Sequence, residues 1–348
     1  MARRNLFLAA AMLIALLPVA RAAEPAPELL KQAQELFRPL PQDRAIIADP
    51  ITKERVALGQ MLFFDPRLTV DGNLSCANCH QPARYGTDGL ATAIGVRNRP
   101  HPRNAPTILN SGLSPIIHWR GDRETLEDQV IKAVTSPITS GQPDEAAVIE
   151  RLRQIPGYGD LFKAAFPDDP QPLTGQNIAA AISVYERSLT TPSAFDRYLA
   201  GDRDALSPKA LSGLEAFINT GCAACHNGVH VGGTMYRKFG IVEDYWKATG
   251  SRVIDKGRAD VTNNPDDLYV FRVASLRNVA MTAPYFHDGS VKTLPEAVKV
   301  MARIQIGATL SDAETGEIAA FLESLTGDLP KNFAAPESLP PGSISVGR

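Results

Sequence analysis

The sequence has no excess of charge of one sign and no long apolar run beyond its first residues. Lys and Arg total 36 against 38 Asp and Glu in 348 residues, which gives a formal net charge of −2. This balance lacks the positive charge that binding to nucleic acid or to an anionic membrane surface requires. After residue 22, no apolar stretch approaches the roughly 20 residues that a membrane-spanning helix needs. We therefore expect an ordinary globular protein that neither binds nucleic acid nor spans a membrane.

The first 22 residues have the organisation of a secretory signal peptide. Arg3 and Arg4 precede an apolar run over residues 6–17, which is too short to cross a bilayer, and small residues surround a cleavage site at 20–22. A membrane anchor is the alternative, but the polar segment that starts at Glu24 argues against it. We expect a mature protein that begins near residue 23 and lies in the periplasm.

Strand-like alternation is scarce, whereas helical spacing of apolar residues recurs along the chain. The spacing predicts helices over residues 52–64, 125–134, 178–199, 209–218, 293–304 and 311–325. Ser207 is placed to cap the fourth of these helices, and Ser311 with Glu314 forms a capping box at the last. Residues 328–348 are rich in Pro, Gly and Ser and indicate an extended or partly disordered tail. The expected fold class is mainly α.

All four cysteines lie in two Cys-x-x-Cys-His pentads. These are Cys76, Cys79 and His80, then Cys222, Cys225 and His226. In this motif each thiol can form a thioether with a haem vinyl group, while the His supplies an axial nitrogen to the iron. Zinc and thiol–disulfide sites also use Cys-x-x-Cys pairs. Two complete pentads, in an exported chain with no other cysteine, instead favour two covalently bound haem c groups.

The second axial ligand of each iron decides what each haem can do. A strong second ligand makes an electron-transfer haem, whereas an open position lets the iron bind peroxide or oxygen. From spacing alone, four methionines outside the signal peptide remain candidates: Met61, Met235, Met281 and Met301. A methionine on a helix is more often a core residue than a ligand.

Similar residues follow the two pentads. Arg103-Asn104 and then His118-Trp119-Arg120-Gly121 follow the first, and Arg277-Asn278 and then His287-Asp288-Gly289 follow the second. Duplication of one unit would explain the likeness, and chance similarity of loop residues is the alternative. We expect two cytochrome c-like haem domains related by an internal duplication. They would cover residues 23–195 and 196–330, after a signal peptide over 1–22 and before a tail over 331–348.

Several segments resemble the bacterial dihaem cytochrome c peroxidases and their MauG-type relatives. The resemblance is carried by residues 276–289, by 103–107, and by Trp119-x-Gly121 with Gln129 further on, and it extends from about Thr52 to Leu325. It implies a periplasmic enzyme that reduces hydrogen peroxide at the N-terminal haem. Electrons would come from a small cytochrome c or cupredoxin and would reach the C-terminal haem first. Members of the family are often homodimers.

The resemblance also implies roles for individual residues. Met301, in a Met-x-x-x-Gln-x-Gly pattern, would be the second ligand of the C-terminal haem, and Met281 a bystander. Trp119 would conduct electrons between the haems, although a buried filler is the alternative, and Gln129 would line the peroxide pocket. A calcium ion would be bound by the Asn104 side chain and by two backbone carbonyls, those of Thr282 and Pro284. Oxygen ligands of this kind suit calcium.

The chain departs from the family at two positions near the N-terminal haem. Many relatives have a removable His ligand after an Ile-Gly or Val-Gly pair, but here Val96 follows Gly95 and cannot bind iron. Either the position is permanently open, or His101 on the same loop replaces it, with His118 as a weaker candidate. Relatives also have a pocket Glu where this chain has Thr139, which is a poor acid–base group at neutral pH. Two carboxylates on the same loop could substitute for it, Asp144 and Glu145.

Three functions are therefore weighed. The leading one is a peroxidase in which electrons arrive at the His226/Met301 haem, cross by Trp119 and reduce peroxide at the His80 haem. The second is a MauG-like oxidase of a protein or organic substrate, which an open position at Val96 favours. MauG-type proteins, however, have a Tyr where this chain has Met301. The third is a non-catalytic dihaem electron carrier or redox sensor, which the missing pocket carboxylate would allow.

Overall fold

The computed structural model describes residues 27–41 and 51–343, so the expected signal peptide lies outside the described residues. The described chain is helix-rich, as its apolar spacing predicts. Its helices are α1 (Pro27–Leu36), α2 (Lys53–Phe64), α3 (Cys76–Cys79), α4 (Leu126–Val134), α5 (Glu145–Arg153), α6 (Pro156–Ala165), α7 (Gly175–Arg187), α8 (Ala194–Leu199), α9 (Pro208–Asn219), α10 (Tyr245–Thr249), α11 (Ala259–Thr262), α12 (Leu294–Met301) and α13 (Asp312–Glu323). Within the same residues, two short antiparallel strands form one sheet, β1 (Tyr236–Lys238) and β2 (Val270–Arg272). No helix there is both long and apolar enough for a membrane span.

Side-chain caps fix where the predicted helices begin. Thr52, Thr125 and Ser207 each accept a hydrogen bond from the backbone N–H three residues later, which satisfies a donor that the helix leaves free. Ser311 and Glu314 form the predicted capping box of α13. These starting points agree with the sequence-based predictions.

Two predicted helices are wrong in extent. The segment 178–199 is not one helix, because α7 ends at Arg187 and α8 begins at Ala194. Pro192 disfavours helical backbone at the residue before it, and Ser193 then caps the new helix. The helix that starts at Leu294 ends at Met301 and continues as a π-helical turn, Ala302–Ile306.

The first lobe, built from α2 to α7, has its own apolar core. α2 packs directly on α7, where Gly59 approaches so closely that a side chain there would collide with the backbone of Ala181. Phe63 and Tyr185 meet at this contact with ring centroids 5.4 Å apart. Burying an aromatic or aliphatic side chain of this size stabilises the fold by about 1.5–3 kcal/mol. This core packs α2 and α7 together beside the first pentad.

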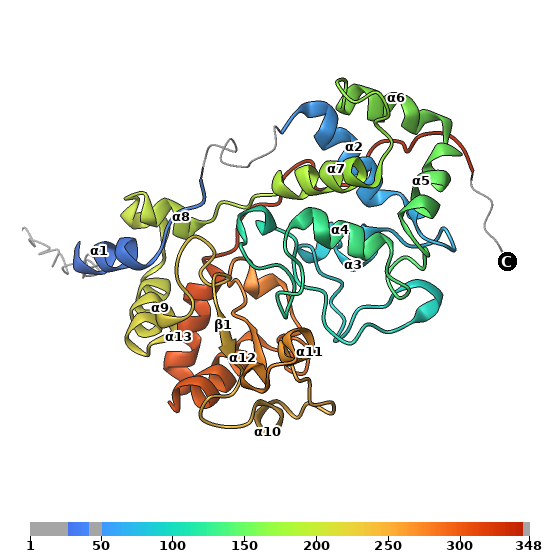
Figure 1. The fold of residues 1–348 in the computed structure, drawn as a ribbon. Helices are drawn as coiled ribbons and strands as arrows, with labels where there is room; N and C mark the ends of the chain where they lie inside the picture. The colour runs from blue at the N-terminus through green and yellow to red at the C-terminus, as the bar shows by residue number, and fades with distance from the viewer. Residues whose placement is uncertain (1–26, 42–50, 344–348) are drawn as a thin grey trace, which may run out of the picture.

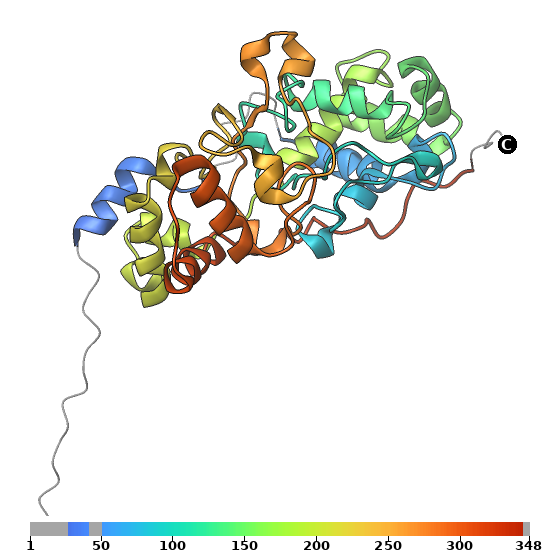
Figure 2. The ribbon, with the colours of Figure 1, turned by 90° about the horizontal axis from the view of Figure 1, so that it is seen from below.

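The second lobe, built from α8 to α13, packs around α9 and α13. Gly213 on α9 lies against the backbone of Glu317 on α13, and Phe217 and Phe321 have ring centroids 5.2 Å apart. A neighbouring apolar cluster joins α12 to the segments around Tyr245 and Tyr285. Figures 1 and 2 show the two lobes side by side, with the loops that follow both pentads between them.

Each end of the described chain packs on the lobe formed by the other half of the sequence. α1 lies against the second lobe, where Phe37 contacts Phe195 with ring centroids 5.3 Å apart. Residues 328–343 run in extended form along the first lobe (Figure 1), and Phe333 is buried there against Phe63. The two ends therefore tie the lobes together.

Candidate haem sites and the junction between them

The first pentad is folded as a single helical turn. α3 comprises Cys76–Cys79, and the Asn78 side chain accepts a hydrogen bond from the Ser75 backbone N–H at 2.7 Å. The His80 backbone N–H donates to the Cys76 carbonyl at 2.9 Å. This turn places both thiols on one short segment with His80 directly after them, as thioether attachment requires.

The His80 ring is oriented by a backbone carbonyl. Its Nδ1 lies 3.0 Å from the Gly86 oxygen, which can only accept, so Nδ1 carries the hydrogen and Nε2 keeps its lone pair. Burial lowers the pKa of His80 and favours the neutral ring. Metal-binding histidines usually have such a partner on the other ring nitrogen. His80 is therefore prepared to bind iron through Nε2.

The second pentad repeats this arrangement in a different local context. The His226 N–H donates to the Cys222 carbonyl at 3.0 Å, and the His226 Nδ1 lies 3.4 Å from the Val231 oxygen. Burial lowers the pKa of His226 to about 4, and the ring of Phe217 stands edge-on to it. Both pentads thus present a neutral imidazole with a free Nε2.

The thiols of the first pentad lack the lowered pKa values of reactive cysteines. Burial raises the pKa of Cys76 to about 12 and that of Cys79 to about 11, whereas reactive thiols have lowered pKa values. In the described part of the chain, no three or more His, Cys, Asp or Glu side chains are grouped to bind a metal ion. Raised thiol pKa values argue against a thiol–disulfide redox site at the first pentad.

A tight hairpin over residues 93–103 lies against the first attachment site. The His101 N–H donates to the Ala93 carbonyl at 2.7 Å, and the Cys79 sulfur lies 3.9 Å from the Ile94 oxygen. A Cβ placed on Gly95 would be 3.1 Å from the His101 Nε2. The hairpin therefore brings the His101 ring beside residues 95 and 96. Burial, and then the neighbouring His118, lower the pKa of His101.

The two positions that depart from the family lie together in space. Val96 is fully buried, and its N–H donates to the Ile138 carbonyl at 2.9 Å. Thr139, the next residue, is held by a hydrogen bond from its own N–H to the Ser136 side chain at 3.1 Å. One loop contact thus joins Val96 to the Thr139 segment, although 43 residues separate them in the sequence.

Gln129 on α4 has a buried side-chain oxygen with no partner among the described residues. Asp144 is not free to assist it, because Asp144 caps α5 and accepts a hydrogen bond from Ala147 at 2.8 Å. Glu145 lies against Gly175 at the start of α7. Both carboxylates are thus placed at helix starts, and the Gln129 amide keeps an unused hydrogen-bonding atom.

Trp119 is bonded to both lobes where they meet. Its indole N–H donates to the Asn104 carbonyl at 2.9 Å in the first lobe, and its own carbonyl accepts from the Arg272 N–H at 2.9 Å in the second. The ring also stands edge-on to His287, with centroids 6.4 Å apart. Trp119 is therefore held where the two lobes meet.

Comparison with known proteins decides the family. A family model described as di-haem cytochrome c peroxidase matches residues 53–204. The cytochrome c551 peroxidase of Pseudomonas aeruginosa is 41% identical over 305 residues, which cover 86% of this chain and 87% of that protein. This chain belongs to the di-haem cytochrome c peroxidase family. The family assignment made from the motifs is thus confirmed.

Other members of the family extend the comparison. The cytochrome c peroxidase Ccp of Escherichia coli is 38% identical over 84% of this chain and 61% of that protein. The methylamine utilization protein MauG of Methylorubrum extorquens is 34% identical over 80% of each chain. A crystal structure of a MauG-like protein associated with microbial copper homeostasis has a TM-score of 0.72 at 30% identity, covering 86% of this chain and 95% of that one. A MauG-like protein therefore shares this fold.

The residues predicted as calcium ligands lie on two segments that meet at the junction. The Asn104 N–H donates to the His287 carbonyl at 2.7 Å, which brings it to the loop that contains Thr282 and Pro284. Within residues 27–41 and 51–343, the Asn104 side-chain oxygen and the Thr282 and Pro284 carbonyls accept no hydrogen bond. The calcium site therefore stays a prediction from the resemblance.

The two methionines in question differ in exposure. Met281 is 46% exposed, whereas Met301 is half-buried at the end of α12. The π-helical turn after Met301 is held by Gln305, whose side-chain oxygen accepts from the Gly240 N–H at 2.7 Å. The end of α12 is therefore fixed in place, as a ligand position would require.

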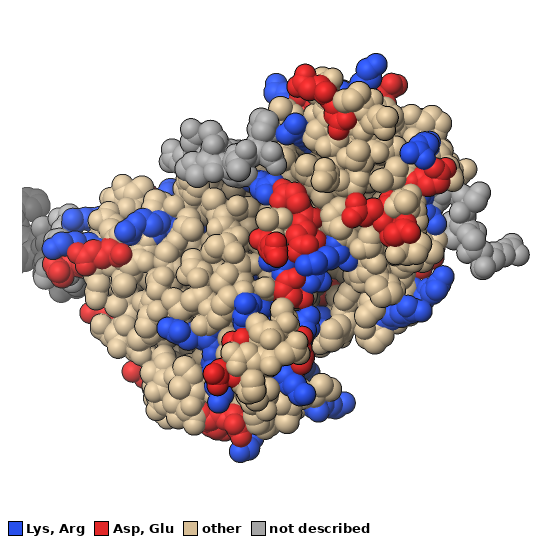
Figure 3. Space-filling view, viewed as in Figure 1, with Lys and Arg blue, Asp and Glu red and all other residues tan. Residues whose placement is uncertain are grey.

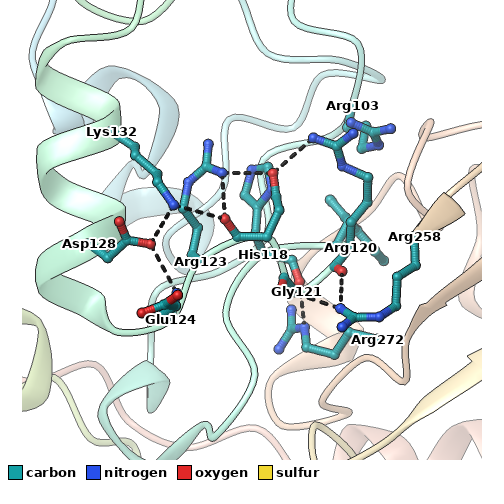
Figure 4. A network of polar contacts seen from close by, with 12 residues as sticks. Arg103, His118, Arg120, Gly121, Arg123, Glu124, Asp128, Lys132, Arg258 and Arg272 are labelled. Carbon is teal, nitrogen blue, oxygen red and sulfur yellow. Dashed lines mark hydrogen bonds and ion pairs between the residues drawn. The ribbon is translucent and has the colours of Figure 1, made fainter. Parts of the chain in front are cut away.

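Several charged side chains near the pentads and at the junction were not predicted from the sequence. Asp88 and Glu186 are buried, and the Glu186 charge contributes to the raised pKa of Cys76. Asp122 at the junction is paired with Arg120 at 2.8 Å and with Arg123 at 2.7 Å. Figure 3 shows acidic and basic side chains gathered where the lobes meet, and Figure 4 shows the network. The run Trp-Arg-Gly-Asp-Arg at 119–123 was the available signal.

Proposed function

We propose that this chain is a periplasmic dihaem cytochrome c peroxidase, which reduces hydrogen peroxide to water with electrons from a small cytochrome c or cupredoxin. The observation that carries the proposal is Trp119, bonded to both lobes between two prepared histidines, His80 and His226. Peroxidases of this family among the relatives support the reaction. Residues 1–22 would be a signal peptide cleaved on export.

Two haem c groups fit the pentads, because each has two thiols and a His with a free Nε2. When bound, haem iron supplies the redox chemistry that splits the peroxide O–O bond. His80 would hold the reactive group and His226 with Met301 the one that receives electrons. The lobes would correspond to haem domains over residues 23–195 and 196–330, related by duplication, with a tail over 331–348. Two separate apolar cores support two domains, with α1 and Phe37 packed into the core of the second and Phe333 into the core of the first.

The residues around the first pentad would handle peroxide and its protons. Reduction of one peroxide to two waters consumes two electrons and two protons. The unpartnered Gln129 oxygen would accept a hydrogen bond from peroxide and orient it. His101, whose pKa is lowered by burial, is neutral at pH 7 and can take a proton from one oxygen and return it to the other. His101 would thus serve where the family has the Glu that Thr139 replaces.

Trp119 would connect the two groups, and a calcium ion at Asn104, Thr282 and Pro284 would brace the junction beside it. The hydrogen bond from the indole to Asn104 links the proposed conduit to the proposed ion site. Two such chains would form a homodimer. Calcium removal is expected to lower turnover without releasing either covalently bound haem, which calcium titration followed by activity assay checks.

The deciding experiment is steady-state peroxide consumption by the purified dihaem protein with a reduced small cytochrome c. We expect turnover, together with a high-spin signal from the His80 haem in the active form. The Trp119→Phe variant should keep both haems but reduce turnover. If both haems stay low-spin in every redox state and peroxide is not consumed, the chain is an electron carrier.

A MauG-like oxidase is the second candidate function. Val96 cannot bind iron, which favours an open position, and the structure of a MauG-like protein matches this fold at 30% identity. The same preparation separates the two functions. Peroxide-dependent oxidation of a protein or organic substrate without donor cytochrome would favour the oxidase, whereas donor-dependent peroxide loss favours the peroxidase.

A further inference from the structure

Arg272 is placed at the junction by bonds to both neighbours of the conduit. It ends β2, and its backbone N–H donates to the Trp119 carbonyl at 2.9 Å. Its side-chain Nε donates to the His118 carbonyl at 3.1 Å. Figure 4 shows Arg272 at the edge of the charged network, next to Arg258. The guanidinium is therefore held in one position beside residues 118–119.

Unlike the other arginines of this network, Arg272 has no acidic partner among the described residues. Arg103 pairs with Asp255, Arg120 and Arg123 pair with Asp122, and Arg258 lies 4.0 Å from Asp267. In residues 27–41 and 51–343, no carboxylate lies within 4 Å of Arg272, and its two Nη groups donate no hydrogen bond. Arg272 is half-buried, and a guanidinium that is partly removed from water is stabilised by an anion that compensates its charge.

The pKa of Arg272 reflects the burial of its charged side chain. Burial lowers the pKa of Arg272 to about 10, although arginine normally stays far above that. At neutral pH the side chain is nevertheless charged. Its planar set of N–H donors is suited to bind a carboxylate with two parallel hydrogen bonds.

The strand that contains Arg272 also borders the second pentad. The Gly233 N–H donates to the Val273 carbonyl at 2.8 Å, and a Cβ on Gly232 would touch both the Ala274 carbonyl and the His226 ring. Burial lowers the pKa of His230, four residues after His226, and the charges of Arg277 and Arg272 lower this pKa further. Because this strand borders the second pentad, a propionate of the haem proposed there is the candidate anion for Arg272.

We propose that Arg272 binds a propionate carboxylate of the haem attached at Cys222 and Cys225. This inference rests on the proposed function only in requiring a haem at that pentad. The ion pair would fix the haem edge beside the backbone of Trp119, where electrons would leave it. It would also favour the reduced haem, because a nearby cation stabilises the electron that reduction adds.

The test is an equilibrium redox titration of the holoprotein, followed by haem absorption, for Arg272→Gln and the parent. We expect the reduction equilibrium of the second haem to shift about tenfold toward the oxidised form, which is about 59 mV for a one-electron couple. Arg272→Lys keeps the charge and should restore most of the parent value. Arg258→Gln is the matched control at the same junction, because Arg258 already has Asp267 nearby, and it should shift far less.

The outcomes separate clearly. Unchanged potentials in Arg272→Gln would overturn the proposal, as would a shift confined to the His80 haem or an equal shift in Arg272→Lys. If Arg272→Gln yields no folded holoprotein, Arg272→Lys and Arg272→Met are compared directly, and equal potentials in these two would overturn it. A shift of the second haem without peroxide turnover would support this inference while the proposed peroxidase function fails.

Discussion

The two pentads share a sequence pattern and a local geometry, yet their surroundings differ in charge. Around the first lie buried carboxyl groups, Asp88 and Glu186, and the additional ring of His101. Around the second lie the ring of Phe217 and the uncompensated Arg272. Acidic and titratable groups suit a site that moves protons, whereas apolar and cationic surroundings favour a reduced haem. The difference between the sites therefore comes from what the fold brings to each pentad.

The largest expected effect is a change in stability from substituting Glu186, which lies beside the first pentad. Burial raises its pKa to about 8, against about 4.5 in the unfolded chain. Between these values the unfolded chain has lost the proton that the folded chain keeps, so stability falls as pH rises from 4.5 to 8 and changes no further above 8. At about 1.4 kcal/mol per pKa unit, Glu186→Gln should be more stable than the parent by about 5 kcal/mol at pH 8, with no difference below pH 4.5.

Unfolding by denaturant at several pH values measures this difference. Glu127→Gln is the matched control, because Glu127 pairs with Arg187 and its pKa is lowered. That carboxylate contributes stability above its unfolded pKa, so the control should lose stability relative to the parent at neutral pH and regain it in acid. A Glu186→Gln profile parallel to the parent would mean that Glu186 is ionised in the folded protein.

The second lobe instead depends on a buried ion pair. Asp196 accepts two hydrogen bonds from Arg277 at 2.9 Å, and it also accepts from the Leu40 N–H at 2.7 Å, which ties the N-terminal segment to this lobe. Asp196→Ala should destabilise the protein by about 3–5 kcal/mol, since it leaves Arg277 buried without its partner. Thermal or denaturant unfolding checks this. Asp202→Ala, which removes an exposed pair with Arg197, should cost under about 1 kcal/mol.

The sequence predicted what is local and missed what depends on distant segments. The pentads, the cap at Ser207 and the capping box at Ser311 were readable, because each uses residues within one helical turn. The break between α7 and α8 was missed, although Pro192 signalled it. Nothing local indicated that Val96 meets the Thr139 loop or that each end of the described chain packs on the other lobe. Nor did it indicate that Arg272 has no acidic partner among the described residues. These arrangements depend on contacts between segments far apart in the chain.

Gln129 tests whether the first site is the reactive one. Gln129→Ala removes the unpartnered amide oxygen and should lower kcat/KM for peroxide about 100-fold, while the potentials of both haems stay unchanged. Steady-state kinetics and a redox titration of the same preparation provide both readouts. Gln154→Ala, at the exposed end of α5, is the control and should be neutral. Equal kinetics in the two variants would remove Gln129 from the proposed pocket.

Substituting Met301 tests whether the second haem has a methionine as its second axial ligand, and Met281 provides the control. A thioether ligand raises the potential of a haem, so Met301→Ala should shift the reduction equilibrium of the second haem at least tenfold toward the oxidised form, about 59 mV. The absorption band of methionine-ligated ferric haem should disappear with it. Met281→Ala should change neither, because Met281 is 46% exposed. If Met281→Ala removes the band instead, α12 does not supply the ligand. Met281, on the loop before His287, would then supply the second axial ligand of the second haem. The contrast between the two sites would rest only on Arg272 and the apolar rings.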